Sequence, residues 1–230
     1  MAMSAKQPPV GPAGAPIGIL GGTFDPVHNG HLRLAMELAT ELDLAQVRLI
    51  PNGRPPHREQ PGATPGQRAK WIRVATADEP LLALDDRELM REGHSYMVDT
   101  LASLRSDFPK HPLCLIMGRD VFAKLPSWHR WQELFDHAHI VLIERPGLPA
   151  ELAPEAVDLL AERGVSDPAA LKNQPTGLIY SYAPPPLVIS ASRIRELIAA
   201  GASPRYLLPE VILEDIMDTD IYRAPRAQST

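Results

Sequence analysis

Residues 17–31 read Ile-Gly-Ile-Leu-Gly-Gly-Thr-Phe-Asp-Pro-Val-His-Asn-Gly-His, and the fold follows from this stretch. Its first four residues form a short apolar run, which is typical of a buried strand. Gly21 and Gly22 then let the backbone turn and let a ligand approach closely, because neither residue has a side chain. Further on, leucines recur every fourth residue from Leu34 to Leu42, which predicts a helix with one apolar face. A strand, a tight turn and a helix are therefore expected in direct succession.

Short apolar runs and helical patterns alternate along the rest of the chain. This alternation predicts an α/β fold: a Rossmann-like, doubly wound, mostly parallel sheet with helices on both faces. Such sheets bind ligands at the carboxyl ends of their strands, where the strand order reverses. The predicted strands are residues 17–20, 46–50, 81–84, 113–117, 139–143, 178–182 and 187–189. The predicted helices are residues 30–42, 64–78, 95–106, 128–135, 193–200 and 209–217, with a further candidate at 154–163.

The 230 residues are enough for one α/β domain with a sizeable core. We predict a single domain over residues 16–230, in which about 190–223 form a small helical part. Residues 1–15 are rich in Pro, Gly and Ala and lack periodicity, so we predict a flexible tail there. Residues 146–175 carry scattered prolines and are interpreted as a peripheral insertion.

The composition narrows the function classes. A formal net charge of -5 argues against a general nucleic-acid binder, which is normally basic. The single cysteine, Cys114, lies in an apolar run and is expected to be a buried thiol, which favours a cytoplasmic protein. The longest apolar runs are about five residues, so no membrane span is expected. The oligomeric state cannot be predicted from these features.

Two histidines stand at the start of the first predicted helix. His28 and His31 are three residues apart, so both imidazoles face one side of the first turn. A helix N-terminus favours anions, and imidazoles there can donate hydrogen bonds to phosphate oxygens. Two such histidines can also be helix caps or a metal pair. The glycine pair and the Asp25-Pro26 turn beside them favour phosphate binding, although the stretch fits neither the G-x-G-x-x-G pattern nor the P-loop.

At this point the stretch resembles a known family. Residues 21–32, GGTFDPVHNGHL, match the T/H-x-G-H signature of the nucleotidylyltransferase superfamily and look most like the bacterial nicotinate-nucleotide adenylyltransferases. Those enzymes make deamido-NAD from ATP and nicotinate mononucleotide. The resemblance implies a nucleotidyltransferase domain in which the first turn and the helix start hold ATP, through Gly21, Gly22, Thr23, Phe24, His28 and His31.

A second segment carries the same resemblance. Residues 189–195 read Ile-Ser-Ala-Ser-Arg-Ile-Arg at the start of a predicted helix. Arginine is a poor choice beside the positive end of a helix, which suggests a fixed anion nearby. The segment is similar to the family motif I-S-S/A-T-x-x-R, with Ser192 in place of the usual Thr. The resemblance implies that Ile189, Ser190 and Ser192 contact ATP, that both serines cap the helix, and that Arg195 pairs with the β- and γ-phosphates.

Three further segments resemble the family's binding site for the nicotinate nucleotide, to which we also assign Asp25. Residues 51–58 are similar to its P-x-x-x-P-P-H-K loop, with Arg58 in place of Lys. Residues 48–73 hold six Lys or Arg and one acidic residue. Such a basic loop can be a solvated face, but beside two phosphate motifs it favours a pocket that binds an anionic ligand.

The second segment, residues 95–101, resembles S-Y-T-x-x-T-L, with Met97 in place of Thr. This implies that main-chain N–H groups there meet the pyridine carboxylate.

The third segment, residues 118–129, resembles the family's G-x-D…L/F-P-x-W run. The resemblance places Gly118 and Asp120 at ATP, with Asp120 on a ribose. It also implies that Trp128 stacks on the nicotinate ring and that the backbone at His129 holds the carboxylate. An aromatic face suits a flat heterocycle. The alternative for Trp128 is core packing, a role we expect for Trp131.

The expected reaction is a direct in-line transfer. His28 and His31 would stabilise the α-phosphate and Arg195 the leaving pyrophosphate, with Mg²⁺ bound through ATP and no metal site built from the protein alone. The partners are then ATP and nicotinate mononucleotide, with no nucleic acid and no membrane. Two alternatives stay open: the same chemistry on nicotinamide mononucleotide or phosphopantetheine, and a non-catalytic nucleotide-binding protein.

Overall fold

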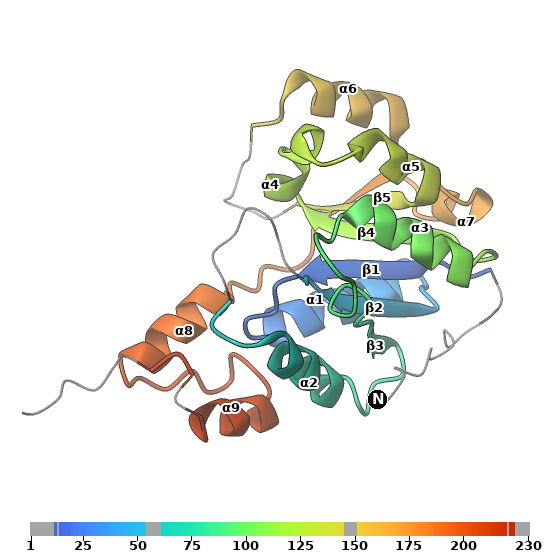
Figure 1. Ribbon diagram of the computed structural model, residues 1–230. Helices are drawn as coiled ribbons and strands as arrows, with labels where there is room; N and C mark the ends of the chain where they lie inside the picture. The colour runs from blue at the N-terminus through green and yellow to red at the C-terminus, as the bar shows by residue number, and fades with distance from the viewer. Residues whose placement is uncertain (1–11, 13, 54–60, 145–150, 220, 224–230) are drawn as a thin grey trace, which may run out of the picture.

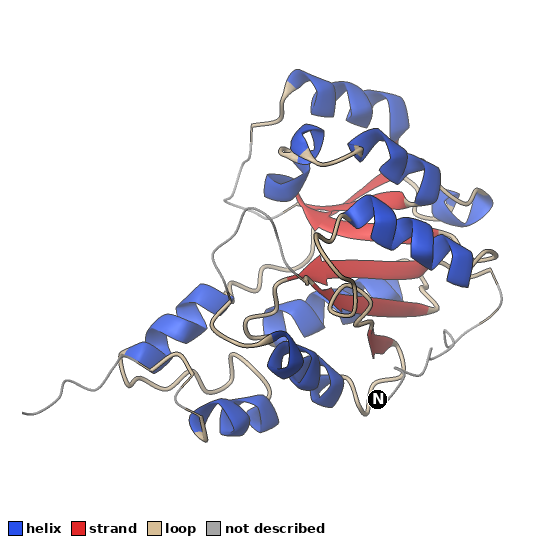
Figure 2. Cartoon of the chain, in the orientation of Figure 1, coloured by secondary structure: helices blue, strands red, loops and turns tan. Residues whose placement is uncertain are grey.

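A sheet of parallel strands forms the centre of the protein (Figures 1 and 2). The computed structural model describes residues 12, 14–53, 61–144, 151–219 and 221–223. Within them the strand order is β3-β2-β1-β4-β5-β7-β6, and every neighbouring pair is parallel. The strands are β1 Ile17–Gly22, β2 Gln46–Pro51, β3 Leu82–Leu84, β4 Leu113–Gly118, β5 His139–Ile143, β6 Gly164–Val165 and β7 Ile179–Tyr182.

The strand order reverses between β1 and β4. From β1 the chain moves outward through β2 to β3, and it then returns to lay β4 against the other edge of β1. Leu20 of β1 lies opposite Ile116 of β4, so the carboxyl ends of these two strands open at the same point. The predicted doubly wound α/β fold is confirmed, and the described sheet is parallel throughout rather than mostly parallel.

Helices cover both faces of the sheet. The helix that begins at Pro65 has a capped start: the Thr64 hydroxyl accepts a hydrogen bond from the Gln67 backbone, the Gln67 side chain accepts one from the Thr64 backbone, and Pro65 occupies the first turn. The helices are α1 Asn29–Glu41, α2 Pro65–Ala75, α3 Met97–Asp107, α4 Arg119–Phe122, α5 Leu134–His137, α6 Pro154–Arg163, α7 Ala170–Asn173, α8 Ala191–Ala199 and α9 Glu210–Met217, with short 3-10 helices η1 Leu125–Ser127 and η2 Trp131–Glu133.

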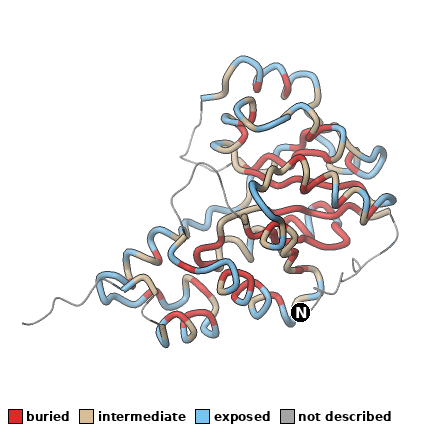
Figure 3. The backbone as a smooth tube through the Cα atoms, in the orientation of Figure 1, coloured by how far each residue is buried: buried red, intermediate tan, exposed pale blue. Residues whose placement is uncertain are grey.

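The alternation of side chains along each strand creates two separate cores. On one face, Leu20 and Ile116 belong to a core that continues through α1 and α2 to the buried residues of α8 and α9. On the other face, Ile19 and Leu115 pack with α3, α4, α5 and α6. The buried backbone in Figure 3 follows these strands. The strands are fixed from both sides, so their carboxyl ends form a rigid base for a site.

The C-terminal helical part lies beside α2, away from the sheet (Figure 1). The indole nitrogen of Trp71 donates to the Asp215 carboxylate of α9 at 2.7 Å, and Lys70 pairs with the same carboxylate. The backbone N–H of Asn29 donates to the carbonyl of Leu207 at 2.9 Å. The start of α1 and the side of α2 therefore hold this part in place.

The predicted strand at 187–189 is wrong. β7, the strand that precedes this segment, already pairs with β5 on one edge and with β6 on the other, so a further strand cannot pair with it. Pro184, Pro185 and Pro186 also lack the N–H that a strand ladder needs. The segment leaves the sheet instead, and Val188 is 99% exposed.

Two other segments differ from expectation. The predicted helix at 128–135 does not begin at 128, because Arg130 adopts a left-handed backbone conformation with φ 51°, and the helical turns that follow it are the 3-10 helix η2 and the α-helix α5. The 146–175 region holds the expected helix α6, but it also supplies β6 to the sheet edge and the buried Leu171 to the core.

The predicted flexible tail, residues 1–15, lies mostly outside the described residues. At its end, the carbonyl of Ala15 accepts a hydrogen bond from the ring of His111 at 2.8 Å.

Candidate active site

A cleft of about 1260 Å³ opens at the carboxyl ends of β1 and β4, where the strand order reverses. The first βα turn, the start of α1, the end of β4 and residues 184–192 line it. This position agrees with the expected ligand site of a doubly wound sheet. The predicted residues that line the cleft are Gly21, Gly22, Thr23, Phe24, Asp25, His28, His31, Met97, Gly118, Asp120, Trp128, Ile189, Ser190, Ser192 and Arg195. His129 does not line it, and Arg58 lies outside the described residues.

The two histidines form a stacked pair at the start of α1. Their ring centroids are 3.7 Å apart with 20° between the planes, and the edge of Phe24 meets the His31 ring at 4.9 Å. His28 occupies the N-cap position, but its side chain makes no capping hydrogen bond. Within the described residues no group of three or more His, Cys, Asp or Glu side chains could hold a metal ion. Both rings line the cleft at the N-terminus of α1.

Gly30 lets the second predicted phosphate segment approach this pair. A Cβ atom at Gly30 would lie 3.0 Å from His28 Nδ1 and 3.3 Å from the Cβ of Ile189. Both distances are tighter than ordinary contacts, so a larger residue would push the 189 segment away. The two segments, far apart in the sequence, are brought together across a residue without a side chain.

The start of α8 is arranged around its hydroxyl groups. The Ser190 hydroxyl accepts a hydrogen bond from the backbone of Arg193 at 3.2 Å, so Ser190 caps the helix as predicted. The Ser192 hydroxyl instead accepts one from Nη2 of Arg195 at 3.3 Å. Only the first serine is therefore the cap, and the second orients the arginine.

Arg195 joins the two segments that the sequence predicts to bind phosphate. Its Nη1 donates to the main-chain carbonyl of Asp25 at 2.8 Å and lies 3.9 Å from the Asp25 carboxylate. The negative charge that the sequence suggested beside Arg195 is thus supplied in part by the Asp25 carboxylate. Arg195 nevertheless lines the cleft.

Asp25 is the meeting point of several elements. The residue is 5% exposed, and its carboxylate accepts hydrogen bonds from the backbone N–H groups of Gly62 and Ala63, each at 3.0 Å. The Tyr222 hydroxyl donates to the same carboxylate. Both carboxylate oxygens are therefore engaged by the protein, and Asp25 holds the first turn, the 62–63 loop and the C-terminal segment together.

Arg68 also holds the first βα turn in place. It is 1% exposed, and its Nη1 donates to the carbonyls of Thr23 and Asn52, each at 2.9 Å. Burial lowers the pKa of Arg68, while the nearby Asp25 and Tyr222 oppose that shift. Arg48 is also buried, with Nε 2.9 Å from the Asp85 carboxylate. The basic residues counted between 48 and 73 therefore do not form a single charged surface.

Besides Asp25, the residues assigned to the second substrate that line the cleft are Met97 and Trp128. Met97 is the first residue of α3, and a Cβ atom at Gly21 would lie 3.0 Å from its terminal methyl group. Trp128 lines the cleft and also packs on the α3-side core, whereas Trp131 packs on that core without lining the cleft. The His129 ring is 4.3 Å from the Tyr96 ring, outside the cleft.

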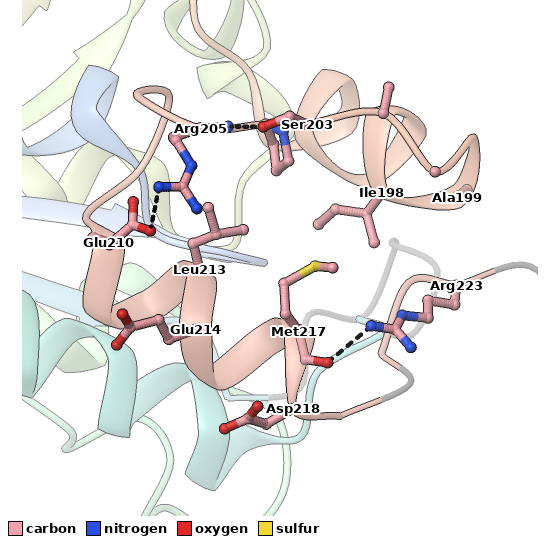
Figure 4. A pocket seen from close by; sticks show the side chains of 13 residues that line it. Ile198, Ala199, Ser203, Arg205, Glu210, Leu213, Glu214, Met217, Asp218 and Arg223 are labelled. Carbon is pink, nitrogen blue, oxygen red and sulfur yellow. Dashed lines mark hydrogen bonds and ion pairs between the residues drawn. The ribbon is translucent and has the colours of Figure 1, made fainter.

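A second hollow, of about 830 Å³, lies between α8 and α9 (Figure 4). An ion pair between Arg205 and Glu210 at 3.0 Å stands at one end of it. At the other end Nη2 of Arg223 donates to the carbonyl of Met217 at 2.9 Å. None of the predicted site residues lines this hollow.

Sequence reasoning missed Arg68, Ala63 and Tyr222 as parts of the site. Arg68 appeared only as one of several basic residues near a loop. Tyr222 lies in a C-terminal stretch, Asp-Ile-Tyr-Arg, that resembles the family's tail, and this resemblance was the only signal for it.

Comparison with known proteins agrees with this geometry. A family model described as cytidylyltransferase-like matches residues 19–197, which is more than half of the chain. The fold and the site thus define a protein of the cytidylyltransferase-like class. Among solved structures, Plasmodium falciparum nicotinic acid mononucleotide adenylyltransferase complexed with NaAD matches with a TM-score of 0.67 over 90% of this chain and 97% of its own. At 16% identity this match supports the fold alone.

Curated relatives identify the family. A protein of Aeromonas salmonicida named "Probable nicotinate-nucleotide adenylyltransferase" is 46% identical over 210 residues, covering 91% of this chain and 98% of the relative. One of Pseudomonas syringae pv. tomato with the same name is 48% identical over 216 residues, covering 93% and 96%. The chain belongs to the nicotinate-nucleotide adenylyltransferase family.

Proposed function

We propose that this chain joins ATP and nicotinate mononucleotide, giving deamido-NAD and pyrophosphate in NAD biosynthesis. The observation that carries the proposal is the cleft itself. It places the stacked His28 and His31 and the Arg195 guanidinium around one space at the reversal of strand order. Family membership supports the choice of both substrates.

The ATP half of the site consists of the first turn, the α1 start and the α8 start. His28 and His31 face the α-phosphate, while Arg195 and the Ser190–Ser192 backbone face the leaving pyrophosphate. Asp120, exposed at the cleft rim, is placed to accept a hydrogen bond from a ribose hydroxyl. The ATP-binding residues we propose are Gly21, Gly22, Thr23, Phe24, His28, His31, Gly118, Asp120, Ile189, Ser190, Ser192 and Arg195.

The acceptor half lies toward α3 and the loop after β4. Trp128 offers a partly buried aromatic face in the cleft, and the first backbone N–H groups of α3 at Met97 suit a carboxylate. We retain His129 and Arg58 as acceptor-binding residues and propose that Asp25 acts by holding the turn. Both oxygens of its carboxylate already accept hydrogen bonds from the protein, which supports this indirect role.

The reaction is an in-line displacement at phosphorus. An oxygen of the acceptor's 5′-phosphate forms a bond to the α-phosphorus of ATP, and the bond from that phosphorus to the bridging oxygen breaks as pyrophosphate leaves. A phosphate monoester is already anionic near neutral pH, so the nucleophile needs no general base. Catalysis then consists of positioning and charge stabilisation.

Mg²⁺ fits this site as an ion carried by the nucleotide. Of the two aspartates at the cleft, the Asp25 carboxylate is occupied by hydrogen bonds, and Asp120 is exposed at the rim. When bound, Mg²⁺ would neutralise charge on the ATP phosphates, held mainly by their oxygens and water.

We also propose a cytoplasmic protein without a nucleic-acid or membrane partner. Cys114 is fully buried, and burial raises the pKa of its thiol to about 12, so the residue is an inert core thiol as expected. Within the described residues no helix is both long and apolar enough to span a membrane.

The decisive test is pyrophosphate release from ATP with each candidate acceptor. We expect rapid release with nicotinate mononucleotide and much slower release with nicotinamide mononucleotide or phosphopantetheine. Faster release with nicotinamide mononucleotide or phosphopantetheine would show that this compound, and not nicotinate mononucleotide, is the acceptor. Binding of ATP without release from any acceptor would favour the non-catalytic alternative.

A further inference from the structure

The C-terminal segment 221–223 reaches back into the first βα turn. The Tyr222 hydroxyl donates to Oδ1 of Asp25, whose carboxylate also accepts two backbone N–H groups. Tyr222 lines the same cleft as the histidine pair. Its ring lies against Gly62, where an added Cβ atom would sit 2.8 Å from the ring. The hydroxyl is therefore aimed at the carboxylate by close packing.

The neighbouring residue anchors this segment from the other side. Nη2 of Arg223 donates to the carbonyl of Met217, in the last turn of α9 (Figure 4). A cation is favourable at that end of a helix, where carbonyls lack partners. The segment is thus held between the end of α9 and the first turn, 197 residues away from it in the sequence.

The backbone at Tyr222 is in an unfavourable conformation. Its φ of 68° lies in the left-handed region, which non-glycine residues seldom adopt. Such a conformation persists only where surrounding contacts hold it, and it often marks a functional site. Here the contacts are the hydrogen bond to Asp25 and the anchoring of Arg223.

The Tyr222 hydroxyl and the Arg195 guanidinium meet at the same residue, Asp25. Nη1 of Arg195 lies 3.9 Å from the Asp25 carboxylate but donates to the main-chain carbonyl instead. The donor from Tyr222 satisfies part of the carboxylate's hydrogen-bonding capacity. Without that donor the carboxylate would attract the guanidinium more strongly and draw it away from the cleft.

We propose that Tyr222 is a positioning residue for the adenylyl transfer: its hydroxyl occupies Asp25, so that the Arg195 guanidinium stays available to the ATP phosphates. The inference rests on the proposed function, since Arg195 is its target at the ATP side. It makes the C-terminal segment part of the active site. It also predicts that loss of the Tyr222 hydroxyl weakens the binding of ATP and leaves the binding of the acceptor unchanged.

The test compares Tyr222→Phe with a matched control, Tyr206→Phe. Tyr206 is 84% exposed and lies outside the cleft, so loss of its hydroxyl should leave the kinetics unchanged. For Tyr222→Phe we expect kcat/KM for ATP to fall about tenfold, mainly through a higher KM, while KM for nicotinate mononucleotide stays the same. Partial unfolding cannot mimic this result, because a smaller folded fraction lowers kcat without changing KM.

A second comparison asks whether the effect passes through Asp25. Asp25→Asn removes the charge that competes for Arg195, so adding Tyr222→Phe to it should have little further effect on KM for ATP. Additive effects of the two substitutions would overturn the inference, and so would equal changes in the KM values of ATP and acceptor. If the wild-type chain releases no pyrophosphate at all, the proposed function fails. Calorimetric Kd values for ATP of the same variants would then still decide the role of Tyr222.

Discussion

The position of the two histidine rings is set by their immediate neighbours. The His28 and His31 rings stack on each other, and Phe24, which has a φ of 51°, closes one side of the pair. A non-glycine residue in that region is unusual and is tolerated here because its ring is buried. The rings are thereby held in place before any ligand arrives, which is the condition for effective charge stabilisation.

Replacing His31 by Ala should damage catalysis far more than folding. We expect kcat to fall on the order of 100-fold, as when one preorganised donor to a transition state is lost. The melting temperature should change by only a few degrees, because His31 is only partly buried. Pyrophosphate release and thermal unfolding measure the two effects.

His111→Ala is the matched control for this substitution. His111 holds Ala15 next to the amino end of β4, so its loss should lower the melting temperature and leave kcat unchanged. A His31→Ala variant that lost melting temperature and activity in parallel would instead show that His31 is a structural residue.

Among the elements, the β5–β7 region depends on one buried imidazole. His139 begins β5, is fully buried, and makes two hydrogen bonds to the connection that leads into β7. Its Nε2 lies 3.0 Å from the carbonyl of Gln174, and its Nδ1 lies 3.1 Å from the backbone nitrogen of Leu178. Nδ1 accepts in this pattern, so the arrangement requires a neutral ring with the proton on Nε2.

The stability of the protein should therefore fall as the solution becomes acidic. Burial lowers the pKa of His139 below its usual 6.5, so in mildly acidic solution the unfolded chain binds a proton that the folded protein does not. The contribution of the neutral ring is complete above pH 6.5 and is lost progressively below it. We expect a loss on the order of 1 kcal/mol in the free energy of unfolding between pH 7 and 5 from this residue.

Urea unfolding at several pH values measures this contribution. His139→Gln should flatten the dependence on pH, because glutamine does not titrate there. His94→Gln, at an exposed histidine, should leave the dependence as it is in the wild-type protein. An unchanged slope in His139→Gln would assign the pH dependence to other groups.

In the whole molecule, the site exists only when the C-terminal helical part is docked. Arg195 and Tyr222 come from that part, and it is attached through Asn29 at the start of α1 and through Trp71 of α2. The Trp71 side chain is fully buried, and its N–H has the Asp215 carboxylate as partner. A contact between residues 144 positions apart in the sequence thus supports the side of the cleft that Arg195 and Tyr222 line.

Asp215→Ala should loosen this docking. The substitution leaves the buried Trp71 N–H without its acceptor, which costs about 1–3 kcal/mol of stability. We expect a lower free energy of unfolding together with a higher KM for ATP. Glu214→Ala, at the exposed neighbour in α9, is the control and should change neither. A normal KM for ATP in Asp215→Ala would mean that docking of α9 does not affect the site.

Much of this molecule could be predicted from sequence because the relevant signals are local. Apolar runs, the helix signals at 64–67 and the glycine pair at 21–22 determine strands, helix starts and turns through contacts within a few residues. The His-x-x-His spacing places two rings on one helix turn for the same reason. The alternation of strands and helices then restricts the sheet to a parallel, doubly wound arrangement.

Only the tertiary structure decided which distant groups complete the site and which segments stay out of the sheet. Residues 187–189 look like a strand, but β7 has both edges occupied, and this cannot be known before the sheet is assembled. Asp25 looks like a ligand-binding residue until Gly62, Ala63 and Tyr222 occupy its oxygens. Hydrogen bonds between residues far apart in sequence depend on the whole packing, so the sequence determined the elements and the phosphate motifs, whereas the fold determined how they are joined.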